Sequence, residues 1–178
     1  MNNRIPYNPS IIEPKWQKKW KDSKIYNVDL DSKNKENYFS LTMFPYPSGD
    51  LHIGHWYAFT PADSYSRFKK MKGFNVLHTQ GFDAFGLPAE NAAISRNINP
   101  MKWTFDNIDN MRGQFNLMGN SYDWTRELIT CTPEYYKWNQ FFFLKMYEKG
   151  IAYRKNGAVW WDPIDQTTLA NEQVVEGK

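Results

Sequence analysis

The sequence predicts an α/β protein in which a parallel sheet is flanked by helices. Two short apolar segments rich in aromatic and β-branched residues, 38–43 and 74–78, are typical of strands. Between them lie a Pro-Tyr-Pro-Ser-Gly turn and a helical pattern over residues 51–72. A strand, a helix and a second strand in this order form a βαβ unit, whose strands run parallel. Because parallel sheets bind ligands at the carboxyl ends of their strands, we expect the chemistry just after these two strands.

The segment ahead of the first strand is expected to form a short helix and a surface loop. Residues 10–23 have a helical pattern, with Ser10 as a candidate N-cap. Trp16 and Trp20 lie four positions apart, which places them on one face of that helix. The polar stretch 29–37 that follows predicts a loop.

The part of the chain after the second strand is mainly helical in pattern. Gly73 is placed to end the first long helix, because glycine readily adopts the left-handed conformation of a helix C-terminus. Helical patterns cover three further segments, residues 87–96, 103–118 and 133–149. The last of them begins with Pro133 and ends at Gly150. Residues 151–161 predict a small hairpin that turns at Asn156-Gly157.

The composition indicates a globular protein and excludes several classes. The 8 Trp, 11 Tyr and 12 Phe residues need a core or an interface to cover them, so disorder is not expected. The longest purely apolar run, 141–144, is far too short to span a bilayer, and the N-terminus has no secretory pattern. A single cysteine, Cys131, excludes an internal disulfide and a cysteine cluster for zinc. We therefore expect a cytoplasmic protein.

The most specific short motif is His52-Ile53-Gly54-His55, at the start of the predicted helix after the first strand. Two imidazoles three positions apart share a helical face, and the first N–H groups of a helix favour an anion. Gly54 leaves room for a planar group to approach the backbone. These features suit a triphosphate. Alone, however, the motif also fits two surface or half-buried histidines, and without a carboxylate or cysteine neighbour it makes a poor metal site.

In its surroundings the motif resembles the HIGH region of class I aminoacyl-tRNA synthetases, and more narrowly that of the leucyl-tRNA synthetases. The resemblance rests on blocks that occur in one order over nearly the whole chain: YNPSIIEPKWQKKW, MFPYPSG-x-LHIGH, GFDAFGLPAENAA, KWTFDNIDNMRGQ, YDWTRELITCTPEYYKWNQFFF and QTTLANEQVVEG. It implies a Rossmann-like (HUP-type) catalytic domain, of which this chain would be the first half.

The resemblance also implies roles for individual residues. His52 and His55 would hold the ATP phosphates and stabilise the transition state, and Gly54 would pack beneath the adenine. The leucine site would be formed by Met43, Phe44, Tyr46 and Asp83. Of these, Asp83 would accept the ammonium group of leucine through a charge-assisted bond. The alternatives are that Asp83 is an N-cap of the helix at 87–96, and that Met43 and Phe44 are ordinary strand core.

Two departures from the family pattern matter. Many leucyl enzymes carry a W-C-P-x-C cysteine pair that helps to hold zinc, whereas residues 161–165 of this chain read WDPID. Because carboxylates replace the thiolates, we expect no zinc and no other resident metal.

The chain also stops at Lys178, about where the inserted editing domain of the family would begin. We expect an N-terminal helix and loop (1–37) packed on half of a catalytic domain (38–178), inactive alone.

The function implied by the resemblance is that of a leucine–tRNA ligase, which activates leucine with ATP and Mg²⁺ and transfers it to tRNA(Leu). The full-length enzyme would be a monomer without a membrane segment. One alternative is a related valyl or isoleucyl enzyme, against which the MFPYPSG and FGLPAENAA blocks argue. Another is a non-catalytic fragment that binds nucleotide or tRNA. A nicotinamide-dependent enzyme is disfavoured, because no GxGxxG sequence follows the first strand.

Overall fold

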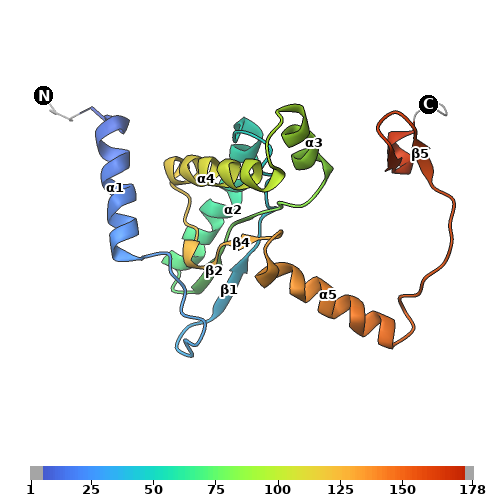
Figure 1. Ribbon diagram of the computed structural model, residues 1–178. Helices are drawn as coiled ribbons and strands as arrows, with labels where there is room; N and C mark the ends of the chain where they lie inside the picture. Colours follow the sequence, from blue (N-terminus) through green and yellow to red (C-terminus); the bar gives the residue numbers. More distant parts are fainter. Residues whose placement is uncertain (1–5, 175–178) are drawn as a thin grey trace, which may run out of the picture. The chain divides into compact units, whose positions relative to one another are not determined.

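The computed structural model of the protein describes residues 6–174 (Figure 1). Its elements follow in the order α1 (Pro9–Ser23), β1 (Asn37–Ser40), α2 (Ile53–Met71), β2 (Asn75–His78), β3 (Gly81–Phe82), α3 (Leu87–Ser95), α4 (Pro100–Met118), β4 (Leu128–Ile129), α5 (Pro133–Glu148), β5 (Trp160–Asp162) and β6 (Thr167–Leu169), with short 3-10 turns at Trp124–Arg126 and Asn171–Gln173. The chain divides into two compact units after Tyr136, and each unit is described by itself.

The predicted βαβ unit is confirmed. Strands β1 and β2 pair in parallel, from Asn37 opposite Asn75 to Ser40 opposite His78, and α2 connects them. Gly73 has a φ of 93°, the left-handed conformation expected where α2 ends. The first strand is shorter than the predicted segment 38–43, because the chain leaves the sheet after Ser40 and runs toward two prolines that cannot donate ladder hydrogen bonds.

A second parallel pair, β3 and β4, forms a separate two-stranded sheet and was not predicted. Each strand has only two residues, with Gly81 opposite Leu128 and Phe82 opposite Ile129. Leu128 N donates to Gln80 O at 3.3 Å, so the stretch from β2 through β3 bonds first to β1 and then to β4. A Cβ atom at Gly81 would overlap the Leu128 carbonyl oxygen, so only glycine permits this close pairing.

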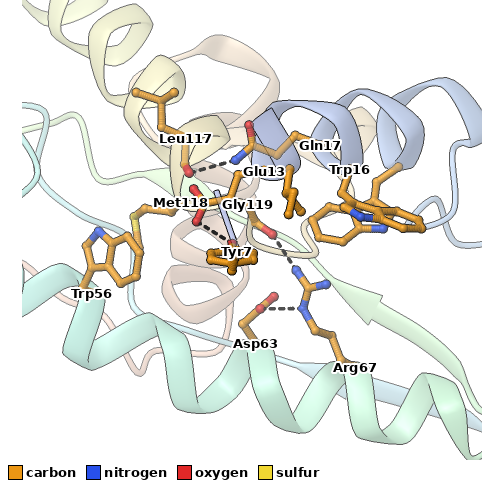
Figure 2. Close-up of a pocket in the computed structure, with 12 residues that line it drawn as sticks. Tyr7, Glu13, Trp16, Gln17, Trp56, Asp63, Arg67, Leu117, Met118 and Gly119 are labelled. Carbon is orange, nitrogen blue, oxygen red and sulfur yellow. Dashed lines mark hydrogen bonds and ion pairs between the residues drawn. The ribbon is translucent and has the colours of Figure 1, made fainter. Parts of the chain in front are cut away.

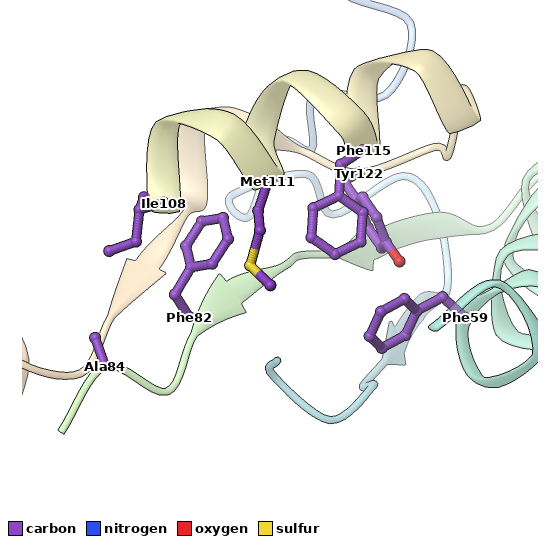
Figure 3. Packing of buried hydrophobic residues seen from close by; sticks show 7 residues of the cluster. All are labelled: Phe59, Phe82, Ala84, Ile108, Met111, Phe115 and Tyr122. Atoms are coloured by element: carbon purple, nitrogen blue, oxygen red, sulfur yellow. The ribbon is translucent and has the colours of Figure 1, made fainter. Parts of the chain in front are cut away.

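The hydrophobic core of the first unit lies between α2, α4 and β3 (Figure 3). Its buried members are Phe59, Phe82, Ala84, Ile108, Met111, Phe115 and Tyr122. Ile108, Met111 and Phe115 recur at helical spacing and form the inner face of α4. Phe115 meets Tyr122 nearly perpendicularly, with ring centroids 5.7 Å apart. This packing anchors α4 against the strand that leads to Asp83.

Helix α1 begins earlier than predicted. Its N-cap is Asn8 rather than Ser10, because the Asn8 side chain accepts a hydrogen bond from Ser10 N at 3.1 Å while Pro9 occupies the first helical position. The tryptophan pair behaves as predicted, since the rings of Trp16 and Trp20 lie 6.5 Å apart. The guanidinium of Arg67 lies 5.0 Å from the Trp20 ring and connects α1 to α2.

The hairpin predicted around Asn156-Gly157 is wrong in position. The antiparallel pair is formed by β5 and β6, from Trp160 opposite Leu169 to Asp162 opposite Thr167. The Asp162 carboxylate accepts a hydrogen bond from Ile164 N at 2.8 Å, and this local bond fixes the turn further along the chain than the Asn-Gly pair. Among the described helices, none is both long and apolar enough to cross a membrane.

The N-cap of α4 gives a test of the local structure. The Asn99 side chain accepts hydrogen bonds from Met101 N at 2.9 Å and Lys102 N at 3.3 Å. We expect Asn99→Ala to lower the free energy of opening of the first turn of α4 by about 1 kcal/mol, measured by amide hydrogen exchange. Asn116→Ala, on the exposed part of the same helix, is the matched control and leaves that turn unchanged. Equal protection in both variants would contradict the capping role.

Candidate active site

The two histidines of the motif form the N-terminal cap of α2. His52 is the N-cap residue, and its Nδ1 atom accepts a hydrogen bond from Gly54 N at 3.1 Å. His55 Nδ1 accepts in turn from His52 N at 3.0 Å. The two side chains thus make a reciprocal capping box. The sequence led us to expect free N–H groups at this helix start, and for His52 and Gly54 this expectation is wrong, because the imidazoles occupy them.

The capping bonds fix the tautomer of both neutral rings. Because each Nδ1 atom accepts a backbone N–H, the proton of each neutral imidazole lies on Nε2. The ring centroids are 4.1 Å apart, so two Nε2–H donors lie side by side at the helix start. Burial, and then the neighbouring His52, lowers the pKa of His55 below its usual value of 6.5. His55 is therefore a neutral donor near pH 7.

Gly54 is required by the position of the His52 ring. A Cβ atom at residue 54 would lie 2.9 Å from His52 Cε1 and 3.0 Å from His52 Nδ1. The ring could swing away at small steric cost, but it would then lose its bond to Gly54 N. The glycine thus keeps the imidazole in its capping orientation.

The proposed leucine residues meet where β1 and β3 end. Asp83 N donates to Pro45 O at 3.0 Å, which joins the residue after β3 to the segment after β1. In this segment the side chains of Met43 and Tyr46 are 80% and 61% exposed, and Phe44 is half-buried. Met43 is therefore not strand core. The structure brings Asp83 next to the apolar segment 43–46, and residues 46–51 connect this segment to the histidines.

Asp83 does not cap α3. The N-cap of that helix is Gly86, which has no side chain to make the bond. The half-buried Asp83 carboxylate instead accepts a hydrogen bond from the Thr130 hydroxyl at 3.3 Å, and the same hydroxyl oxygen accepts from Ala84 N at 2.8 Å. Sequence reasoning missed Thr130, because it follows a strand of two residues that has no pattern of its own.

Sequence reasoning also missed a buried polar network between α2 and the end of β2. The Asp63 carboxylate accepts from the backbone N and the hydroxyl of Ser121, both at 2.6 Å, and from Arg67 Nε at 2.8 Å. His78 Nδ1 lies 3.3 Å from the same Ser121 hydroxyl. Burial lowers the pKa of His78 to about 4, so its ring is neutral at physiological pH. These groups connect α2 to the end of β2.

A cavity of about 630 Å³ lies between α1, α2 and the end of α4 (Figure 2). Trp16 lies on one side of the cavity and Trp56 on the other, with Arg67 at its floor. None of the site residues predicted from the sequence lines it. Within residues 6–174 there is no group of three or more His, Cys, Asp or Glu side chains placed to hold a metal ion.

Comparison with known proteins identifies the family. The profile of the tRNA synthetases class I (I, L, M and V) matches residues 15–178. The chain belongs to the class I tRNA synthetases. Two leucine–tRNA ligases, from Dehalococcoides mccartyi and Rubrobacter xylanophilus, are 58% and 56% identical to this synthetase chain over 171 and 173 residues. These matches cover 96% and 97% of the chain but only 21% of each relative, so the chain spans about a fifth of their length.

Solved class I synthetase structures share the fold. A structure described as the ternary complex of Agrobacterium radiobacter LeuRS with tRNA and LeuAMS aligns with 97% of this chain and 22% of its own, at a TM-score of 0.87 and 43% identity. Methionyl-tRNA synthetase of Mycobacterium tuberculosis, in complex with methionyl-adenylate, aligns with 80% of this chain and 28% of its own, at a TM-score of 0.68 and 24% identity. The Rossmann-like class I synthetase fold predicted from the sequence is therefore confirmed.

Proposed function

We propose that the full-length protein to which this synthetase chain belongs is a leucine–tRNA ligase. The observation that carries the proposal is the meeting of the segments that follow β1 and β3. Asp83 N donates to Pro45 O, and the chain after Pro45 leads to two oriented imidazole donors. A carboxylate suits an ammonium group, and paired N–H donors suit phosphate oxygens. We choose leucine as the amino acid substrate because the similar relatives reported above are named leucine–tRNA ligases.

In the proposed reaction, the leucine carboxylate attacks the α-phosphorus of ATP. The new P–O bond forms leucyl-adenylate, and the bond to the β-phosphate breaks to release pyrophosphate. Negative charge on the phosphoryl oxygens shifts during this step, and the Nε2–H groups of His52 and His55 would stabilise it. Gly54 would leave the backbone open beneath the adenine. The imidazoles act as donors and take up no proton.

Leucine would bind at the other end of the loop. Asp83 would accept hydrogen bonds from its ammonium group, with the carboxylate held in place by Thr130. Met43, Phe44 and Tyr46 would line the side-chain pocket. Such an apolar pocket separates aliphatic amino acids that differ by one methylene by only about 10- to 200-fold.

Further parts of the proposal concern the whole protein. The leucyl group would pass from the adenylate to a hydroxyl at the 3′ end of tRNA(Leu), with release of AMP. ATP would enter as its Mg²⁺ complex, without a resident zinc. The full-length protein would act as a monomer in the cytoplasm, and residues 1–37 would form an N-terminal appendage of the catalytic domain at 38–178.

Amino-acid-dependent exchange of pyrophosphate into ATP tests the proposal. We expect the full-length protein to catalyse exchange with leucine far more efficiently than with valine or isoleucine. Exchange that depends on valine or isoleucine but not on leucine would overturn the choice of amino acid. No exchange with any amino acid would favour a non-catalytic binding protein.

The glycine of the histidine cap gives a second prediction. Gly54→Ala displaces the His52 ring, so we expect kcat/KM for ATP in the exchange reaction to fall about 10-fold. Gly113→Ala is the matched control, because that glycine lies in α4 with nothing within 4 Å of an added Cβ atom. It should leave exchange unchanged and stabilise α4 by about 0.5–1 kcal/mol. Equal exchange rates for both variants would show that the ring position does not matter.

A further inference from the structure

Two amide side chains of α4 bind the turn that precedes the histidine cap. Gln114 Oε1 accepts a hydrogen bond from Leu51 N at 2.7 Å, and Gln114 Nε2 donates to Asp50 Oδ1 at 2.9 Å. Asn110, one helical turn earlier, donates to the same Asp50 oxygen at 2.7 Å. Two consecutive residues of the turn are therefore bound to one face of α4.

These bonds end one residue before the cap begins. The backbone N–H of Leu51 is bound by Gln114, and the next N–H group, that of His52, is bound by His55. The Leu51 side chain also packs against the core cluster that includes Phe115. The path of the chain into α2 is thus fixed by α4 on one side and by the cap on the other.

Helix α4 is a rigid support for this turn. Its adjacent, core-facing side carries Ile108 and Met111, which are 0% and 1% exposed. Gln114 is half-buried, so its two hydrogen bonds are partly shielded from water, and the Leu51 N–H would lose its acceptor if this side chain were removed. Because Leu51 directly precedes His52, a displacement of the Leu51 backbone would also displace the His52 imidazole.

We propose that Gln114 is a positioning residue for the adenylation reaction, acting through the Asp50–Leu51 turn on the two histidine donors. The proposal rests on the proposed function, since it assigns Gln114 a role in ATP use. Gln114 itself does not touch the reactants. Its effect is geometric, because displacement of an oriented donor by about 1 Å can cost up to about 100-fold in rate.

A charge-conserving exchange of side chains tests this role. Gln114→Glu keeps an acceptor for Leu51 N but places a second carboxylate against Asp50, which pushes the turn away from α4. Asp50→Asn alone keeps an oxygen for both α4 donors. In the double variant, the amide introduced at position 50 can donate to the carboxylate introduced at position 114, and its oxygen can still accept from Asn110. The net charge of the pair is the same as in the wild type.

The variants are compared in the full-length protein by leucine-dependent exchange. For Gln114→Glu we expect kcat/KM for ATP to fall about 10- to 100-fold, with the KM for leucine unchanged. Asp50→Asn should stay within about twofold of the wild type, and the double variant should recover to within about threefold. Asn116→Asp, which adds one negative charge at an exposed position of α4, is the matched control and should show no effect.

The outcomes separate this proposal from the proposed function. If the wild type shows no amino-acid-dependent exchange, the proposed function fails. If the wild type exchanges and Gln114→Glu does so equally well, the positioning role is wrong. It is also wrong if Gln114→Glu lowers kcat with both KM values unchanged and the double variant does not recover, because that pattern indicates a general loss of folded protein.

Discussion

Replacing His52 with asparagine is expected to lower kcat of leucine-dependent exchange about 100- to 1000-fold while leaving the helix start intact. Asparagine is among the best N-cap residues, so its side-chain oxygen can take over the bond from Gly54 N that His52 Nδ1 accepts. What the variant loses is the Nε2–H donor. Exchange kinetics and the thermal midpoint of the full-length protein measure the two effects separately.

His52→Ala is the companion variant, because it removes both the donor and the cap. We expect the same loss of exchange together with a destabilisation of the α2 start by about 1 kcal/mol. If His52→Asn exchanged as fast as the wild type and only His52→Ala were slow, His52 would be a capping residue and its role toward phosphate would be wrong.

Replacing Asp83 with asparagine is expected to raise the KM for leucine in the exchange reaction about 10- to 100-fold, because a hydrogen bond to a charged group contributes about 1.5–3 kcal/mol. The amide retains an oxygen for the Thr130 hydroxyl, so the local structure should persist. The KM for ATP should stay the same, since the phosphates are assigned to the histidines.

The control for Asp83→Asn is Asp106→Asn, which removes a carboxylate paired with Lys102 on the exposed side of α4. It should leave both KM values unchanged, since exposed ion pairs contribute little. An unchanged KM for leucine in Asp83→Asn would remove Asp83 from the amino-acid site. An increased KM for ATP alone would place this carboxylate on the nucleotide instead.

Local patterns were sufficient to predict the first βαβ unit. The strand at 74–78, the helix that ends at Gly73 and their order each leave a signal within a few residues, and the structure confirms them. The pair β3 and β4 could not be predicted in this way, because two-residue strands exist only through their pairing with each other. The hairpin failed for a related reason: the Asn156-Gly157 pair favours a turn, but the Asp162 side chain fixes another one.

The candidate site was predictable only in part, for similar reasons. His52 and His55 could be found from the motif, and Asp83 from the resemblance to the leucyl-tRNA synthetases. The use of both Nδ1 atoms as helix caps depends on rotamers that a sequence does not specify. Thr130 and Gln114 reach the site from positions 47 and 63 residues away from their partners in the chain, so no local signal marks them.

The most direct test of the central claim is a structure of the full-length protein with ATP and leucinol. Leucinol keeps the ammonium group of leucine but lacks the carboxylate that attacks ATP, so both ligands can be held unreacted. We expect the Nε2 atoms of His52 and His55 at hydrogen-bond distance, about 2.7–3.2 Å, from phosphate oxygens, and the leucinol ammonium on Asp83. Phosphates bound away from both imidazoles, or an ammonium group bound away from Asp83, would contradict the account.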